Sequence, residues 1–128
     1  MDEIIKTVQG IVVKGTMIGK KIGFPTINIE YDRLDIPFGI YVSKVHTPDG
    51  LYNGAMHFGP KETMGITEPS LEVYLLDFSG DLYGQSVTVD VYEKIRDVKG
   101  FDTLDALKKQ IRLDVDHVRA VMQKVVVK

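Results

Sequence analysis

The chain has 128 residues, of which 44% are hydrophobic and 27% charged, a balance that suits one globular domain with one core. It has no cysteine, which excludes disulfides, thiolate metal sites and a cysteine nucleophile. The net charge of −2 gives no general attraction for a phosphate polymer, and no signal peptide or membrane-spanning apolar run is present. We therefore expect a single domain over residues 1–128, cytoplasmic, with no nucleic acid or membrane as partner.

Most of the chain shows the two-residue alternation of strands. The predicted strands cover residues 8–14, 39–45, 51–58, 71–78 and 86–92. The turn Thr47-Pro48-Asp49-Gly50 joins the second and third of these into a hairpin. Five or six antiparallel strands without helical crossovers predict a closed barrel or a sandwich.

The segment 15–28 is the first whose residues suggest a binding or catalytic role. It combines three glycines, two adjacent lysines and a Pro-Thr-Ile-Asn stretch. Backbone amides of such a loop can approach phosphate oxygens closely, and a lysine adds charge. Side chains alternate along an extended chain, so Thr26 and Asn28 point the same way and offer oxygen ligands suited to magnesium. The alternative is an ordinary glycine-rich turn. The loop is not a P-loop, because no Gly-Lys-Ser/Thr closes it before a helix.

The second candidate is Glu72, within the apolar strand 71–78. Alternation places it on the face opposite Leu71 and Val73. If those two face the core, Glu72 lies among aromatic and aliphatic neighbours, where partial desolvation favours a role as general base. The alternative is a solvated or cross-strand paired residue.

The period changes to that of a helix near the C-terminus. One apolar stripe contains Leu104, Leu107, Ile111, Val118 and Met122. Asp102 is the predicted N-cap of this helix, with Asp105 as a weaker reciprocal partner. The charged residues are expected to form a solvated face, with the helix packed over one end of the barrel. The tail 125–128 is predicted to add an edge strand or to fray.

Several motifs, in their order and spacing, resemble the riboflavin kinase family over about residues 8–119. They are Gly-Phe-Pro-Thr-Ile-Asn at 23–28, then 37–41, 71–78, 81–84, and Ile95-Arg96 followed by 101–104. The resemblance implies a mainly β fold: a six-stranded antiparallel Greek-key β-barrel with a C-terminal α-helix. It also implies transfer of the ATP γ-phosphate to the ribityl 5′-hydroxyl of riboflavin, with Mg²⁺, giving FMN and ADP.

The resemblance assigns the nucleotide site by match to the family's Pro-Thr-Ala-Asn motif. Thr26 and Asn28 would contact magnesium and the nucleotide phosphates. Gly15 and Lys20 would line the nucleotide loop, and Tyr83 would border the nucleotide.

The resemblance also assigns the acceptor site. Glu72 matches the family's catalytic base, which takes the proton from the ribityl hydroxyl as it attacks the γ-phosphorus. Arg96 and Lys99 lie in the flap that in the family closes over the flavin. Bacterial members often carry an adenylyltransferase domain ahead of the kinase. Since the first predicted strand begins at residue 8, we expect FMN to be the end product of this chain, which is expected to be a monomer.

Four positions depart from the family pattern. Ile27 replaces alanine, His57 stands where bacterial members commonly carry asparagine, Glu62 replaces proline, and Val98 occupies a usually acidic position. These changes affect the expected flavin contacts more than the phosphate chemistry. His57 is expected to be a strand histidine and not a ligand.

Two alternatives belong to other functional classes. The first is a catalytically silent flavin- or nucleotide-binding β-barrel, against which the joint presence of Thr26, Asn28 and Glu72 argues. The second is an oligonucleotide-binding barrel, which would need a basic, aromatic-rich strand face that this sequence does not supply.

Overall fold

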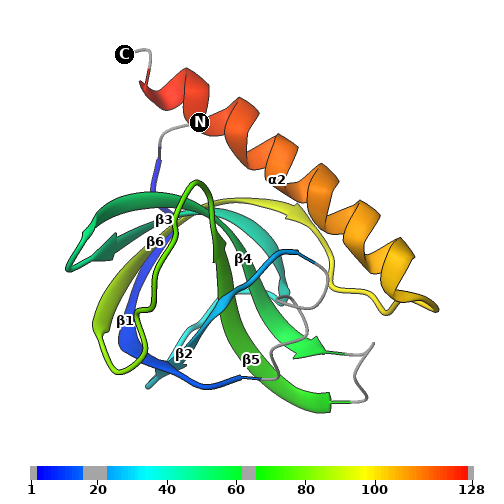
Figure 1. The fold of residues 1–128 in the computed structure, drawn as a ribbon, viewed down its shortest axis with the longest axis horizontal. Helices are drawn as coiled ribbons and strands as arrows, with labels where there is room; N and C mark the ends of the chain where they lie inside the picture. The colour runs from blue at the N-terminus through cyan, green and yellow to red at the C-terminus, as the bar shows by residue number, and fades with distance from the viewer. Residues whose placement is uncertain (1–2, 16–22, 62–65, 127–128) are drawn as a thin grey trace.

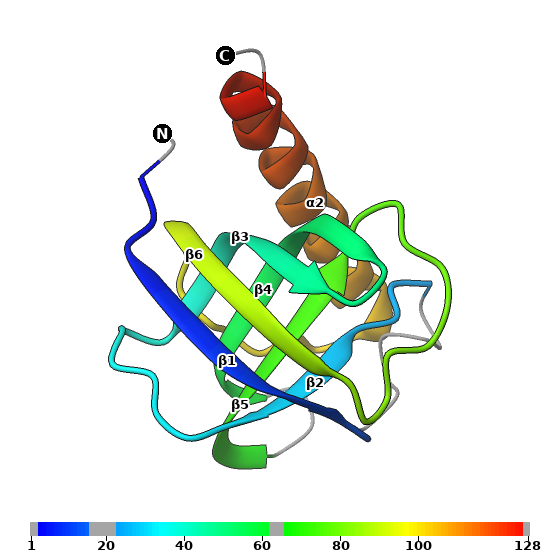
Figure 2. The ribbon, with the colours of Figure 1, turned by 90° about the vertical axis from the view of Figure 1, so that its left-hand side faces the viewer.

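A computed structural model describes the chain except for residues 1–2, 16–22, 62–65 and 127–128 (Figure 1). Its strands form a closed barrel, and one long helix lies against the outside of the barrel wall (Figure 2). The elements are β1 (Lys6–Val13), β2 (Ile27–Tyr31), β3 (Gly39–Thr47), β4 (Gly50–Lys61), β5 (Ile66–Leu75), β6 (Ser86–Arg96) and α2 (Leu104–Val126).

The six strands follow the order β1-β2-β5-β4-β3-β6 around the barrel, and every neighbouring pair is antiparallel. β1 closes the barrel by pairing with both β2 and β6, so that Val8 lies opposite Val89. β2 and β3 are consecutive in the chain but not in the barrel, and the same is true of β5 and β6. The predicted Greek-key barrel with a C-terminal helix is therefore confirmed.

The barrel interior is filled by alternate strand residues, as the period of two requires. Val45, Met56, Val73 and Val89 are all completely buried there. A second apolar cluster lies between the outside of the barrel and α2. It contains Val42, Leu76, Tyr92, Val115, Val118 and Met122. Strand β3 is buried on both faces because it lies between these two clusters.

All five predicted strands differ from the observed strands at one or both ends, and β2 was not predicted as a strand. β5 stops at Leu75, before the predicted end at residue 78, because Asp77 adopts a φ of 60°, which an extended strand cannot contain. The short strand β2 was read only as an extended stretch. It is stabilised by pairing with β1 and β5, which sequence alternation over five residues does not reveal.

The helix predictions need four corrections. α2 packs against the outer wall of the barrel, on β3 and β4, and not over one end as predicted. Thr103 is the N-cap in place of Asp102, since the Ala106 amide donates to Thr103 Oγ1 at 3.1 Å. Leu104 is 44% exposed, because the first turn of α2 extends past the apolar cluster. Residues 125 and 126 of the tail belong to α2 and not to a strand, and residues 127–128 lie outside the described residues. No helix in the described part of the chain has both the length and the apolar character that a membrane crossing requires.

Candidate functional site

One row of side chains crosses the outer face of the barrel through Glu72. The strand register pairs Asn28 with Glu72, Glu72 with His57, His57 with Ile40, and Ile40 with Arg96. Residues directly opposite on antiparallel strands share a face, with Cβ atoms about 4.5–5.5 Å apart. We call these five residues the Glu72 row. It brings three of the predicted site residues onto one surface.

Glu72 is buried, with 8% of the residue exposed. Its Oε1 accepts a hydrogen bond from the Thr26 hydroxyl at 2.9 Å, and its Oε2 forms an ion pair with Lys61 Nζ. A buried carboxylate is costly unless it is paired and hydrogen-bonded, and both conditions are met here. Two predicted residues, Thr26 and Glu72, are thus in direct contact.

Lys61 was missed by the sequence analysis. It lies at the end of β4, and burial lowers the pKa of its ammonium group. The predicted strand ended at residue 58. Continued alternation from His57 would have placed Lys61 on the same face, so a signal was present in the sequence.

The stretch that carries Thr26 is held against the barrel by aromatic packing. The Phe24 ring meets the Tyr74 ring edge to face, with centroids 5.3 Å apart. Asn28 then begins the pairing with Glu72 in β2. A Cβ atom on Gly15 would overlap the Asn28 carboxamide, so the backbone at Gly15 lies directly against that side chain. Gly15 therefore lies against Asn28, two residues after Thr26.

Tyr83 lies beside the start of this loop. The Gly84 amide donates to the Val12 carbonyl at 2.9 Å, which fixes the Leu-Tyr-Gly turn to the end of β1. Lys14 Nζ lies 5.8 Å from the centre of the Tyr83 ring, which is 56% exposed. The ring is thus an exposed platform next to Gly15. Lys20 lies outside the described residues.

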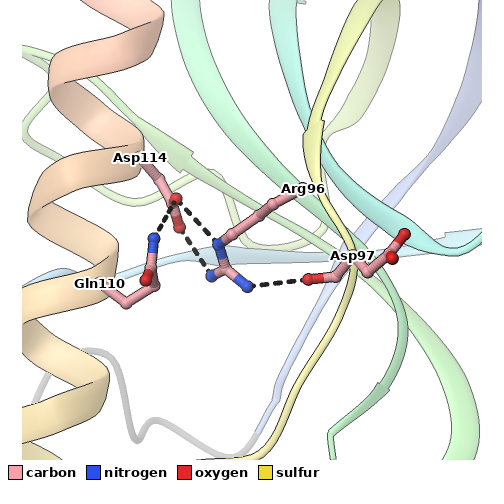
Figure 3. A network of polar contacts seen from close by, with 4 residues as sticks. All are labelled: Arg96, Asp97, Gln110 and Asp114. Carbon is pink, nitrogen blue, oxygen red and sulfur yellow. Dashed lines mark hydrogen bonds and ion pairs between the residues drawn. The ribbon is translucent and has the colours of Figure 1, made fainter.

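Arg96 forms a clamp between β6 and α2 (Figure 3). Its Nε and Nη2 donate to the two carboxylate oxygens of Asp114 at 3.0 and 2.8 Å, and its Nη1 donates to the Asp97 carbonyl at 3.0 Å. Gln110 donates to the same carboxylate at 3.1 Å. Asp114 is only 3% exposed. We refer to this contact as the Arg96–Asp114 clamp.

Residues 97–103 connect the clamp to the helix, and we call them the flap. Arg96, which was predicted from the resemblance to lie in the flap, is instead the last residue of β6. Lys99 Nζ lies 5.1 Å from the centre of the Phe101 ring, and the Arg96 guanidinium lies 5.9 Å from the same centre. Both cations therefore face one aromatic ring. Val98 Cγ2 would lie 3.1 Å from a Cβ atom added at Gly59, which places the flap beside this part of β4.

His57 is the row member between Glu72 and Ile40. Burial lowers its pKa to about 4, with a smaller contribution from the positive charge of Lys61. The ring is therefore neutral near pH 7. Its Nδ1 is buried and has no hydrogen-bond partner among the described residues.

The available ligands fit a weakly held hard cation better than a dedicated metal cage. Within the described residues there is no cluster of three or more His, Cys, Asp or Glu side chains that could hold a metal ion. The Thr26 hydroxyl and the Asn28 carboxamide are neutral oxygen ligands beside the Glu72 carboxylate. This set suits Mg²⁺ that keeps waters and takes its other oxygens from phosphates.

Comparisons with known proteins agree on one family. The family model described as riboflavin kinase, Flavokinase, matches residues 5–122. An RNA-binding riboflavin kinase of Bacillus subtilis is 37% identical over 112 residues, which cover 87% of this chain and 49% of that protein. A bifunctional riboflavin kinase/FMN adenylyltransferase of Haemophilus influenzae is 41% identical over 113 residues, covering 87% of this chain and 37% of that protein.

A solved structure shares the fold. Riboflavin kinase from Trypanosoma brucei superposes with a TM-score of 0.66 at 28% identity, covering 92% of this chain and 77% of that one. The chain spans half or less of the length of the two curated relatives, at 49% and 37%.

Proposed function

This chain belongs to the riboflavin kinase family, and on that premise we propose that residues 1–128 form one kinase domain that converts riboflavin and ATP to FMN and ADP. The observation that carries the proposal is the hydrogen bond between Thr26 and Glu72. It joins a candidate magnesium and phosphate ligand to a candidate base, which is the arrangement that phosphoryl transfer requires.

The reaction follows from these positions. Glu72 takes the proton of the ribityl 5′-hydroxyl while that oxygen bonds to the γ-phosphorus and the bond to the ADP oxygen breaks. Thr26 and Asn28 would hold Mg²⁺, which when bound neutralises charge on the phosphate oxygens. Gly15 and Lys20 would line the phosphates, and Tyr83 would border the nucleotide.

The flap is proposed to cover the flavin. Arg96 already uses three donor groups on Asp114 and Asp97. Its contribution to flavin binding is therefore proposed to be support of the flap, whereas Lys99 is exposed and free to approach the ligand while it faces Phe101.

The direct test is incubation of the purified chain with riboflavin, ATP and magnesium, followed by chromatographic detection of FMN. We expect FMN to form and to require the metal. Binding of both substrates without FMN would instead indicate a silent binding barrel.

We also propose that the chain acts as a cytoplasmic monomer without nucleic acid. The net charge of −2 supports the last point. The Bacillus subtilis relative is named an RNA-binding riboflavin kinase, and this name describes that protein and not the present chain.

Thr26→Ala and Asn28→Ala are expected to weaken nucleotide binding only when magnesium is present. Each removes an oxygen ligand near the surface and not a core side chain, so the unfolding free energy should change by only about 1 kcal/mol. Calorimetric titration with ADP, with and without magnesium, measures the effect. Equal affinity for variant and parent in both conditions would exclude the residue from the metal site.

Gly15→Ala is expected to weaken ADP binding about tenfold, equivalent to about 1.4 kcal/mol. The new methyl group would displace the Asn28 carboxamide, which occupies that space. The control is Gly15→Ala in an Asn28→Ala background, where the same change should have little further effect. An equal loss in both backgrounds would show that Gly15 acts independently of Asn28.

A further inference from the structure

His57 has a feature that the reaction above does not use. Its Nδ1 is buried and lacks a hydrogen-bond partner among the described residues. Native proteins leave few buried polar atoms in this state, and such an atom is a candidate for contact with a ligand. The other strand histidine, His46, differs in this respect, because its Nε2 lies 2.7 Å from Asp90.

The electrostatics of His57 restrict the kind of ligand. Burial and the nearby charges of Lys61 and Arg96 keep the ring neutral near pH 7. A neutral imidazole has one donor and one acceptor nitrogen, and either can pair with a hydroxyl, which both donates and accepts. An anion can only accept, so it would pair with the donor nitrogen alone, and a cation would be repelled by the positive charges of Lys61 and Arg96. An alcohol therefore fits best.

The strand register gives the position of that alcohol. His57 lies directly opposite Glu72 and shares its face, with Cβ atoms about 4.5–5.5 Å apart. A ligand whose reacting hydroxyl lies at Glu72 would place a hydroxyl one or two carbons further along its chain near His57. On the far side of His57 the row continues through Ile40 to Arg96 at the base of the flap.

We propose that His57 Nδ1 hydrogen-bonds a secondary hydroxyl of the ribityl chain, so that His57 determines specificity for a polyol-bearing flavin. The flavin then extends along the Glu72 row, with its reacting end at Glu72 and its ring toward Ile40 and the flap. This inference rests on the proposed function. It also revises the expectation that His57 is only a strand residue.

The test compares riboflavin with lumiflavin, which has the same ring system but a methyl group in place of the ribityl chain. Dissociation constants are measured by flavin fluorescence in the presence of ADP and magnesium. His57→Leu should weaken riboflavin binding tenfold or more and leave lumiflavin binding unchanged. His57→Asn should keep riboflavin binding within a few-fold of the parent, because a carboxamide also donates and accepts.

His46→Leu is the matched control, since it makes the same substitution at a strand histidine that pairs with Asp90. It should change neither constant. Equal loss of both ligands in His57→Leu, or loss of neither, would overturn the inference. If His57→Leu does not fold, His57→Ala and His57→Asn are compared in its place, and equal riboflavin affinity in those two would overturn it.

Turnover of the parent chain separates the two proposals. FMN formation combined with unchanged ligand selectivity in the His57 variants refutes the role of His57 alone. Loss of riboflavin selectivity in His57→Leu without FMN formation by the parent refutes the kinase proposal alone. A parent chain that does not bind riboflavin refutes both.

Discussion

Glu72→Gln is expected to lower kcat by ~10²–10⁴-fold, the usual contribution of a positioned general base. Glutamine keeps the size of the side chain and can still accept the Thr26 hydrogen bond, but it cannot take the ribityl proton. The dissociation constants of riboflavin and ADP should stay within a few-fold of the parent values. Steady-state kinetics and ligand titration on the same preparation provide both measurements.

The control for this variant concerns Lys61. Glu72→Gln also removes the anionic partner of a largely buried ammonium group, which has 11% of its side chain exposed. Lys61→Gln removes the same ion pair but leaves the carboxylate, so it separates loss of the ion pair from loss of the base. A Glu72→Gln protein with near-parental kcat, or one that loses no more kcat than Lys61→Gln, would falsify the assignment of Glu72 as base.

Asp114→Asn is expected to lower the free energy of unfolding by on the order of 3 kcal/mol, because loss of one partner leaves a buried charge without compensation. The Arg96 side chain is 19% exposed and the Asp114 side chain 4% exposed. The neutral amide can still accept one hydrogen bond, so we expect a loss near the lower end of the range that is usual for breaking a buried ion pair. Urea denaturation measures the change.

The chain contains a matched control for the Arg96–Asp114 clamp. Arg119 donates to both oxygens of Asp77 at 3.0 Å and also joins α2 to the barrel, but these side chains are 49% and 73% exposed. Asp77→Asn should therefore change stability little, since solvent screens the pair. Asparagine is chosen because it tolerates the φ of 60° at this position. Similar destabilisation by both substitutions would refute the argument from burial.

Sequence alternation predicted which face of the strand 71–78 carries the chemistry. Glu72 lies outside the barrel while Leu71 and Val73 lie inside it, as predicted. The side-by-side placement of Asn28, Glu72 and His57 could not be predicted in this way. It depends on the register of strands far apart in the chain, and a shift of one residue would turn every side chain to the opposite face.

The contact between Arg96 and Asp114 could not be predicted from the sequence, for a related reason. Arg96 and Asp114 are 18 positions apart, and their meeting depends on the angle at which α2 docks on the barrel. The capping signal at the start of α2 was accurate only to within one residue. Thr103 and Asp102 are both suitable capping residues, and only the path of the chain into α2 selects Thr103.

The closure of the barrel by β1 and β6 has a consequence for folding kinetics. Lys6 pairs with Val91, so the barrel cannot close until nearly three-quarters of the chain is available for folding. Pairings of such high contact order are slow to form, because loop entropy must be lost before they contribute. The Glu72 row spans β2, β5, β4, β3 and β6. Because the row spans five of the six strands, we expect the site to form only when most of the barrel has formed.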